Sequence, residues 1–149
     1  MKCIADKTWQ VPNELEALTT TSGEVEAWLA SHGLRPRVPY TARLIVEEMG
    51  TNIIKYGYDD RLPHFIHVQV LLGDERVRVL MEDDGHPFNP FEQPPPNLEE
   101  LFASPREGGL GIELVRRVCV KWNYERVGKW NRVTLDIAQR IPDDDVEEP

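Results

Sequence analysis

Two oxygen-bearing side chains one turn apart on a predicted helix are the first residues here that could do chemistry. Glu48 lies three residues after Ile45, and Asn52 lies three residues after Met49, so both fall among the apolar positions of the helix. A carboxylate and an amide in such positions cost free energy unless they meet partners. The pair therefore indicates either bridges to neighbouring elements or a site for a hard cation and its hydration shell.

Asp83 is a third polar residue that could take part in binding or catalysis, because it ends a predicted strand on the inward face. It lies two and four residues after Met81 and Val79, so its side chain points to the same face of the strand as theirs. An acid in this position can accept a hydrogen bond from a ligand N–H, or it can cap its own turn. Gly85 follows two residues later and lets the chain turn with little side-chain bulk.

Glycines occupy three of the four positions at the start of a later predicted helix. They are Gly108, Gly109 and Gly111, with Leu110 between them. Backbone N–H groups at a helix N-terminus favour an anion, so this segment predicts a phosphate site. Its spacing is neither a Walker pattern nor a Rossmann fingerprint. A hinge for the proline-rich segment before it is the competing interpretation.

The elements that must position these residues follow from the spacing of apolar side chains. Gly50, within the helix of Glu48, indicates close approach of a ligand or another backbone, or has no role. Consecutive hairpins predict an α+β two-layer sandwich, with a mixed, mostly antiparallel sheet of about five strands and helices on one face. The first expected elements are a strand at 8–11 and a helix that Asn13 caps and Gly33 ends, with Gly23 weakening or breaking it. A second helix is expected from about Pro39 to Tyr56, followed by a hairpin across Gly73-Asp74. A helix after Gly111 and a hairpin across Gly128-Lys129 complete the expected order.

Composition limits the classes of protein that this chain can represent. The 149 residues fit one domain, and 40% hydrophobic with 29% charged residues are typical of a globular protein. No apolar run reaches the roughly 20 residues of a membrane span. Two cysteines give no disulfide framework and no metal-ligand spacing, so a reducing cytoplasm is expected. A net charge of −9 without a basic cluster argues against nucleic acid as a partner.

The order and separation of these motifs resemble the GHKL superfamily of ATPases and kinases, most closely the bacterial anti-sigma-factor serine/threonine kinases. Residues 45–52 look like the N box of that family, and residues 82–90, with their Pro-Phe-Asn-Pro ending, look like its G1 box. Residues 108–112 resemble the G2 box, and residues 128–135 resemble the closing hairpin. The resemblance runs from about residue 9 to residue 137.

This resemblance implies a role for several residues. Asn52 would bind Mg²⁺, and Glu48 would be the general base. Asp83 would accept from the adenine amino group, Gly85 would give the base room, and Thr134 would join the adenine end through a water. The box of Gly108, Gly109, Leu110 and Gly111 would bind the phosphates of ATP, with backbone N–H groups of Gly109 and Gly111 as donors.

The resemblance also implies a domain plan and a function. Residues 1–141 would form one ATP-binding domain with an ATP lid at about 91–107. The acidic residues at 142–149 separately predict a disordered tail. The expected function is Mg-ATP-dependent phosphorylation of a STAS-like anti-sigma-factor antagonist, with a sigma factor and a second copy of the chain as further candidate partners. Two alternatives are an ATP-dependent binding module without kinase activity and the catalytic domain of a histidine kinase.

Overall fold

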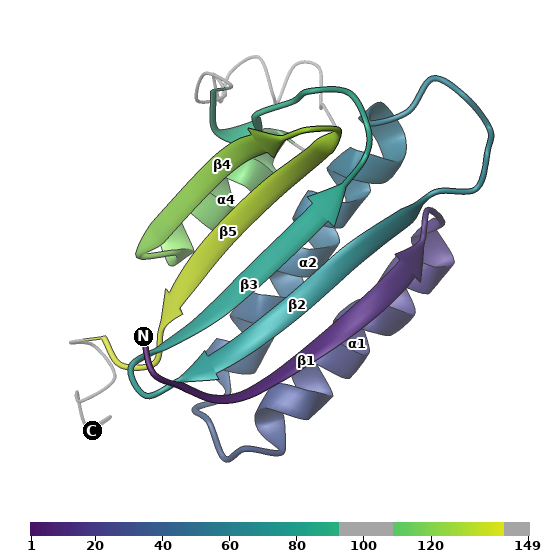
Figure 1. Ribbon diagram of the computed structural model, residues 1–149. Coiled ribbons are helices and arrows are strands. Elements are labelled where there is room, and N and C mark those ends of the chain that lie inside the picture. The colour runs from purple at the N-terminus through teal and green to yellow at the C-terminus, as the bar shows by residue number, and fades with distance from the viewer. Residues whose placement is uncertain (93–108, 142–149) are drawn as a thin grey trace.

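A five-stranded sheet is the framework of the molecule (Figure 1), in a computed structural model that describes residues 1–92 and 109–141. Its strand order is β1-β2-β3-β5-β4, and every pairing is antiparallel, so the expected mixture of directions is not found. The strands are β1 (Cys3–Pro12), β2 (Phe65–Gly73), β3 (Arg76–Asp83), β4 (Lys121–Val127) and β5 (Trp130–Ala138). The helices are α1 (Leu15–Ala30), α2 (Arg37–Tyr56), the short 3-10 helix η1 (Pro90–Glu92) and α4 (Gly109–Val118).

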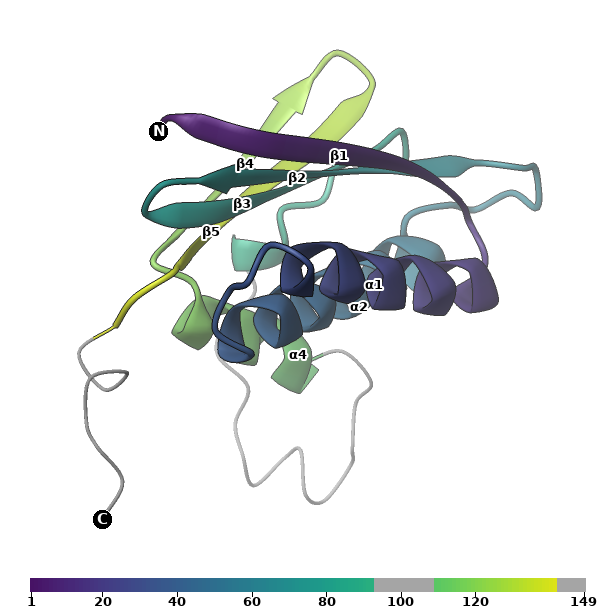
Figure 2. The same ribbon diagram turned by 90° about the horizontal axis from the view of Figure 1, so that it is seen from below.

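All three α-helices of the described residues lie on one face of the sheet (Figure 2), which confirms the expected two-layer α+β sandwich. The alternation that predicted the strands also decides which side chains meet the helices. Val68 and Val79 are fully buried in the core, whereas Gln69 and Leu80 on the other face are only partly buried. The apolar side of each strand therefore supplies half of one core, and the helices supply the rest.

The first strand and helix differ from the sequence expectation at their junction. β1 is ten residues long and pairs with β2 along its whole length, so it begins well before residue 8. The backbone N–H of Asn13 donates to His64 O at 2.9 Å, which holds Asn13 against the β2 side of the fold. Glu14 is consequently the residue before α1, and the buried Oδ1 of Asn13 has no hydrogen-bond partner. Asn13 therefore does not cap the helix, and α1 continues unbroken through Gly23.

Gly50 lets α1 and α2 pack closely against each other. A Cβ atom on Gly50 would lie 2.8 Å from Cδ2 of Leu18, a fully buried side chain of α1. The glycine is thus explained by a helix–helix contact with a side chain, rather than by a ligand or another backbone. This contact fixes the position of α2, the helix that carries Glu48 and Asn52.

The turns and cysteines complete the description of the fold. Asp74 and Glu75 form the β2–β3 turn, because Gly73 is still paired within β2. The β4–β5 turn begins at Gly128, as expected, with a φ of 59°. Cys3 is exposed, whereas burial, with a further contribution from Asp136, raises the pKa of the Cys119 thiol to about 12.

Some predictions fall on residues that the structure does not describe. The expected lid at 91–107 lies outside the described residues except for Phe91 and Glu92, and the tail at 142–149 lies outside them entirely. The domain boundaries therefore stay a prediction. None of the helices in the described residues is both long and apolar enough to span a membrane.

Candidate functional site

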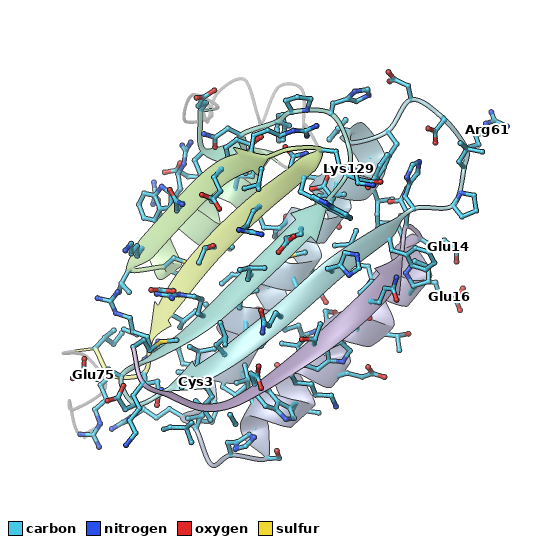
Figure 3. The ribbon with its side chains drawn as sticks, in the orientation of Figure 1. Cys3, Glu14, Glu16, Arg61, Glu75 and Lys129 are labelled. Atoms are coloured by element: carbon cyan, nitrogen blue, oxygen red, sulfur yellow. The ribbon has the colours of Figure 1, made fainter. Side chains whose placement is uncertain are left out.

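A pocket lies between α2 and the ends of β3 and β5. It belongs to the end of the sheet that Figure 3 marks with Lys129 and Arg61, whereas Glu75 and Cys3 lie at the opposite end. The walls are largely apolar, with amide and carboxylate groups from three elements, as is typical of small-ligand sites. Its lining residues are Met49, Asn52, Ile53, Tyr56, Gly57, Met81, Asp83, His86, Phe88, Pro90, Asn131 and Val133.

Asp83 is the buried acid of this pocket, on the inward face as predicted, and only 5% of its surface is exposed. Its Oδ2 atom accepts hydrogen bonds from the Gly85 N–H at 3.0 Å and from Nδ2 of Asn131 at 3.1 Å. Burial raises the pKa of the Asp83 carboxyl, and these two donors act against that rise. Because both bonds end on Oδ2, the Oδ1 atom is left to accept from a ligand.

Gly85 is required by the close approach of two chain segments. A Cβ atom there would collide with the carbonyl oxygen of Gly57, at the end of α2, and would lie 2.9 Å from Oδ2 of Asp83. The neighbouring His86 N–H donates to Gly57 O at 2.9 Å. The glycine thus allows the loop after β3 to dock on α2, which keeps Asp83 at the pocket.

Thr134 does not reach this pocket, in contrast to the expectation. It pairs with Leu80 of β3 on the face of the sheet that is turned away from the helices, whereas Val133 lines the pocket. Asn131 shares the parity of Val133 and lies within hydrogen-bonding distance of Asp83. The sequence reasoning missed Asn131 as a site residue, although its alternation with Arg132 could have placed it on the inward face.

Glu48 and Asn52 occupy successive turns of α2. The side-chain amide of Asn52 donates from Nδ2 to the Glu48 carbonyl oxygen at 2.9 Å, which leaves its Oδ1 as the atom able to ligate a cation. Asn52 is 9% exposed and lines the pocket, while Glu48 is half-buried. Burial is the main cause that raises the pKa of Glu48, and the charge of Glu47 adds to it while Lys55 opposes it.

The first turn of α4 lies against Glu48. A Cβ atom on Gly111 would collide with the Glu48 carboxylate, so the glycine lets that side chain lie directly against the helix. Gly109 and Leu110 belong to the same first turn, and Gly108 lies just outside the described residues. The structure therefore brings together Glu48 and the glycine-rich start of α4, which the sequence separates by some sixty residues.

Asn52 joins the two halves of the site into one. It lines the pocket of Asp83 and lies one helical turn from Glu48. The arrangement offers an acceptor for an N–H donor at one end, an amide oxygen for a cation in the middle, and a carboxylate beside a helix N-terminus at the other end. Within residues 1–92 and 109–141, no group of three His, Cys, Asp or Glu side chains could hold a metal ion by itself.

This combination of fold and site defines a nucleotide-binding domain of the ATPase and kinase type. The family described as "Histidine kinase-like ATPase domain" matches residues 11–137, which is most of the chain. The chain belongs to this family, and ATP use is the property that the family implies for it.

Individual proteins agree with this assignment. The chain is 27% identical over 126 residues to the serine/threonine-protein kinase BtrW of Bordetella bronchiseptica, and the match covers 82% of this chain and 89% of that protein. The blue-light activated histidine kinase EL346 of Erythrobacter litoralis has a similar structure, with a TM-score of 0.54 and 20% identity. That match covers 80% of this chain and 41% of the histidine kinase, and it supports the fold alone.

Proposed function

We propose that this chain is a Mg-ATP-dependent serine/threonine protein kinase that acts in the cytoplasm on a small STAS-like protein. The observation that carries the proposal is the placement of Asn52 on α2, between the pocket of Asp83 and the carboxylate of Glu48. A nucleotide with its base in the pocket would direct its phosphates along α2 towards Gly111. The similarity to a protein named as a serine/threonine kinase favours a hydroxyl acceptor.

Asp83 would select the base. Its unused Oδ1 can accept from the exocyclic amino group of adenine, whereas guanine presents an acceptor oxygen at the corresponding position. A hydrogen bond to an ionised carboxylate is stronger than one between neutral groups. The apolar residues around the pocket, such as Met49 and Val133, would contact the faces of the ring.

Asn52 would hold the metal ion through Oδ1. Mg²⁺ is usually bound by one or two protein oxygens together with substrate phosphates, so one amide oxygen is a sufficient protein contribution. When bound, the ion would neutralise charge on the phosphates. The backbone N–H groups at the start of α4 would add donors for the same negative charge.

Glu48 would act on the acceptor hydroxyl. Its position beside Gly111 places a carboxylate next to the expected phosphate site. A pKa raised by burial makes this carboxylate a better proton acceptor than an exposed glutamate. The base would orient the hydroxyl and take its proton while the phosphoryl group is transferred.

The choice of protein partner rests on the family resemblance of the sequence motifs. A STAS-like antagonist is the proposed substrate, and a sigma factor and a second copy of the chain are secondary candidates. The intact pair of Glu48 and Asn52 favours catalysis over ATP-dependent binding alone. The binding module nevertheless makes a distinct prediction, because it would capture the partner without modifying it.

Glu48→Gln and Asn52→Ala distinguish these functions. Glu48→Gln keeps the shape but removes the base, so ATP affinity should equal or slightly exceed that of the parent while transfer falls by roughly 10²–10⁴. Asn52→Ala removes the metal ligand and should lose Mg-dependent affinity and transfer together. The measurements are single-turnover phosphoryl transfer to the STAS-like protein and equilibrium binding of Mg-ATP.

Glu16→Gln on the exposed side of α1 is the matched control, because it removes one charge without touching the site (Figure 3). Equal transfer rates in the parent and Glu48→Gln would reject Glu48 as the base. If the parent binds the partner only with ATP and transfers nothing, the binding module replaces the kinase.

A further inference from the structure

Among the described residues that line the pocket of Asp83, Asn131 has the side chain with the most hydrogen bonds. It is 4% exposed and is the second residue of β5, on its inward face. Its Oδ1 accepts from the hydroxyl of Tyr124 at 2.6 Å and from Nη1 of Arg126 at 3.2 Å, both on β4. The backbone N–H of Phe88 is a third donor, at 3.3 Å. The carboxamide therefore links the β4–β5 hairpin to the loop that follows β3.

Two of these groups, the Arg126 guanidinium and the Phe88 N–H, can only donate, and they decide which way the amide faces. A rotated amide would point its NH₂ group at the Arg126 guanidinium and at the Phe88 N–H, where no acceptor is available. Nδ2 accordingly faces the other side, where it donates to Asp83 Oδ2 at 3.1 Å and to the His86 carbonyl at 2.7 Å. The network thus presents a donor, and never an acceptor, to the buried carboxylate of Asp83.

The donor has two effects on Asp83. It occupies Oδ2 and so leaves Oδ1 for the ligand, and it stabilises the charged form of a group whose burial favours the neutral form. A protonated Asp83 could present a hydroxyl donor to the base, which suits the acceptor oxygen of guanine, so the preference for adenine would weaken. The identity of residue 131 therefore bears on both the orientation and the charge of the acid that reads the base.

We propose that Asn131 is the positioning residue for base selection: its carboxamide, fixed by Tyr124 and Arg126, holds Asp83 in the orientation that accepts the adenine amino group. The inference rests on the proposed ATP site and assigns a function within it to the β4–β5 hairpin. Arg126 extends the same link, because Nη1 also donates to the Gly85 carbonyl at 2.8 Å. Base selection thereby depends on the whole β4–β5 hairpin, although only Asn131 and Val133 of that hairpin are among the residues that line the pocket.

Asn131→Asp tests this proposal through its pH dependence. The variant places a second carboxyl at hydrogen-bonding distance from Asp83, and two such groups share one proton because they do not both ionise readily. The shared proton restores a donor to Asp83 at low pH and is lost as the pH rises. The other charged or titratable groups that face this pair are Asp84 and His86 on the same loop, Tyr58 after α2, and Tyr124 and Arg126 on β4.

The measurement is calorimetric titration of full-length parent and variants with Mg-ATP and with Mg-GTP at several pH values. In the parent, ATP affinity should be constant at neutral pH and fall only towards acid, where Asp83 gains a proton. In Asn131→Asp, it should fall on the order of tenfold as the pH rises. A residue with a merely structural role would not produce this opposite trend.

Asn123→Asp is the matched control, because Asn123 is exposed on β4 and the same charge is introduced away from the pocket. It should retain the pH profile of the parent. Tyr124→Phe removes one of the three donors to Asn131 and should reduce the preference for ATP over GTP severalfold, which keeps the test open if Asn131→Asp does not fold.

The outcomes separate this inference from the proposed function. Asn131→Asp with the pH profile and ATP preference of the parent would overturn the inference while leaving the ATP site in place. An unchanged ATP preference in Tyr124→Phe would overturn it as well. A parent that binds neither nucleotide would reject the ATP site and the inference together.

Discussion

The two ends of the site are built differently. At the pocket end, Asp83 and Asn131 are both buried, and their polar atoms bind each other and the surrounding loop. At the α4 end, Glu48 is half-buried, and Asn52 donates to a backbone carbonyl with Nδ2 alone. Groups that select a base must keep one orientation, whereas groups that ligate a cation or take a proton need oxygen atoms that are not occupied by other hydrogen bonds. The contrast predicts that substitutions at the first end alter the preference for one nucleotide over another, and that substitutions at the second end alter Mg-dependent binding and phosphoryl transfer without changing that preference.

Asp83→Asn is the most direct test of this contrast, and it has the largest expected effect. It removes the charged acceptor, so ATP affinity should fall by about 1.5–3 kcal/mol, the range for hydrogen bonds to charged groups. The preference for ATP over GTP should fall with it, as measured by calorimetric titration with both nucleotides. Glu82→Gln is the control, since Glu82 lies next in sequence but pairs with Arg132 at 3.2 Å on the other face. Equal ATP affinity in Asp83→Asn and the parent would contradict the assignment of the pocket.

Gly111→Ala should affect the other end alone. Its methyl group would displace the Glu48 carboxylate, so phosphoryl transfer should slow on the order of tenfold and up to about a hundredfold, while the base pocket is unchanged. Gly23→Ala is the matched change in α1, because a Cβ atom there has no neighbour within 4 Å. That control should keep the transfer rate and raise the stability by about 0.4–1 kcal/mol. The assays are single-turnover transfer and thermal unfolding, and a full transfer rate in Gly111→Ala would show that Glu48 need not stay beside α4.

The smallest expected effect is a shift in the pH profile of transfer. Only the ionised form of Glu48 can accept a proton, so transfer should decrease as the pH falls through its raised pKa, while ATP affinity stays constant over that range. Lys55 lowers the pKa of Glu48, so Lys55→Met should move the midpoint to higher pH. Lys7→Met on β1 should leave the midpoint in place. A midpoint that Lys55→Met does not move would mean that another group controls the profile.

The sequence predicted most of the fold because its signals are local. Alternation along β2 and β3 identified the inward face, and the same parity placed Asp83 at the pocket. The periodicity of α2 likewise placed Asn52 among the buried positions. Such patterns hold because one face of each element must be removed from water, whatever its partners are.

The remaining features depend on contacts that join distant parts of the chain. The contact of Gly50 with Leu18 spans two helices, so the glycine alone could not reveal its cause. Asn13 loses its capping role because its backbone bonds to His64, some fifty residues away. Thr134 is a different case, since its alternation with Val133 already placed it on the outer face, and the family resemblance overrode that pattern. Asn131 could have been identified by the same rule, but the hydrogen-bond partners that make it important come from two separate segments, β4 and the stretch from Asp83 to Phe88.

The burial of Cys119 gives the molecule a chemical marker for the movement of α4. Thiol reagents attack the thiolate, and a pKa raised to about 12 leaves almost none of it at neutral pH. Cys3 is exposed, so a reagent can reach it without any movement of the fold. Because Cys119 is buried directly after α4, modification of its sulfur requires this region to open. The rate at which Cys119 reacts therefore reports how often the C-terminal end of the helix that carries Gly111 opens to the solvent.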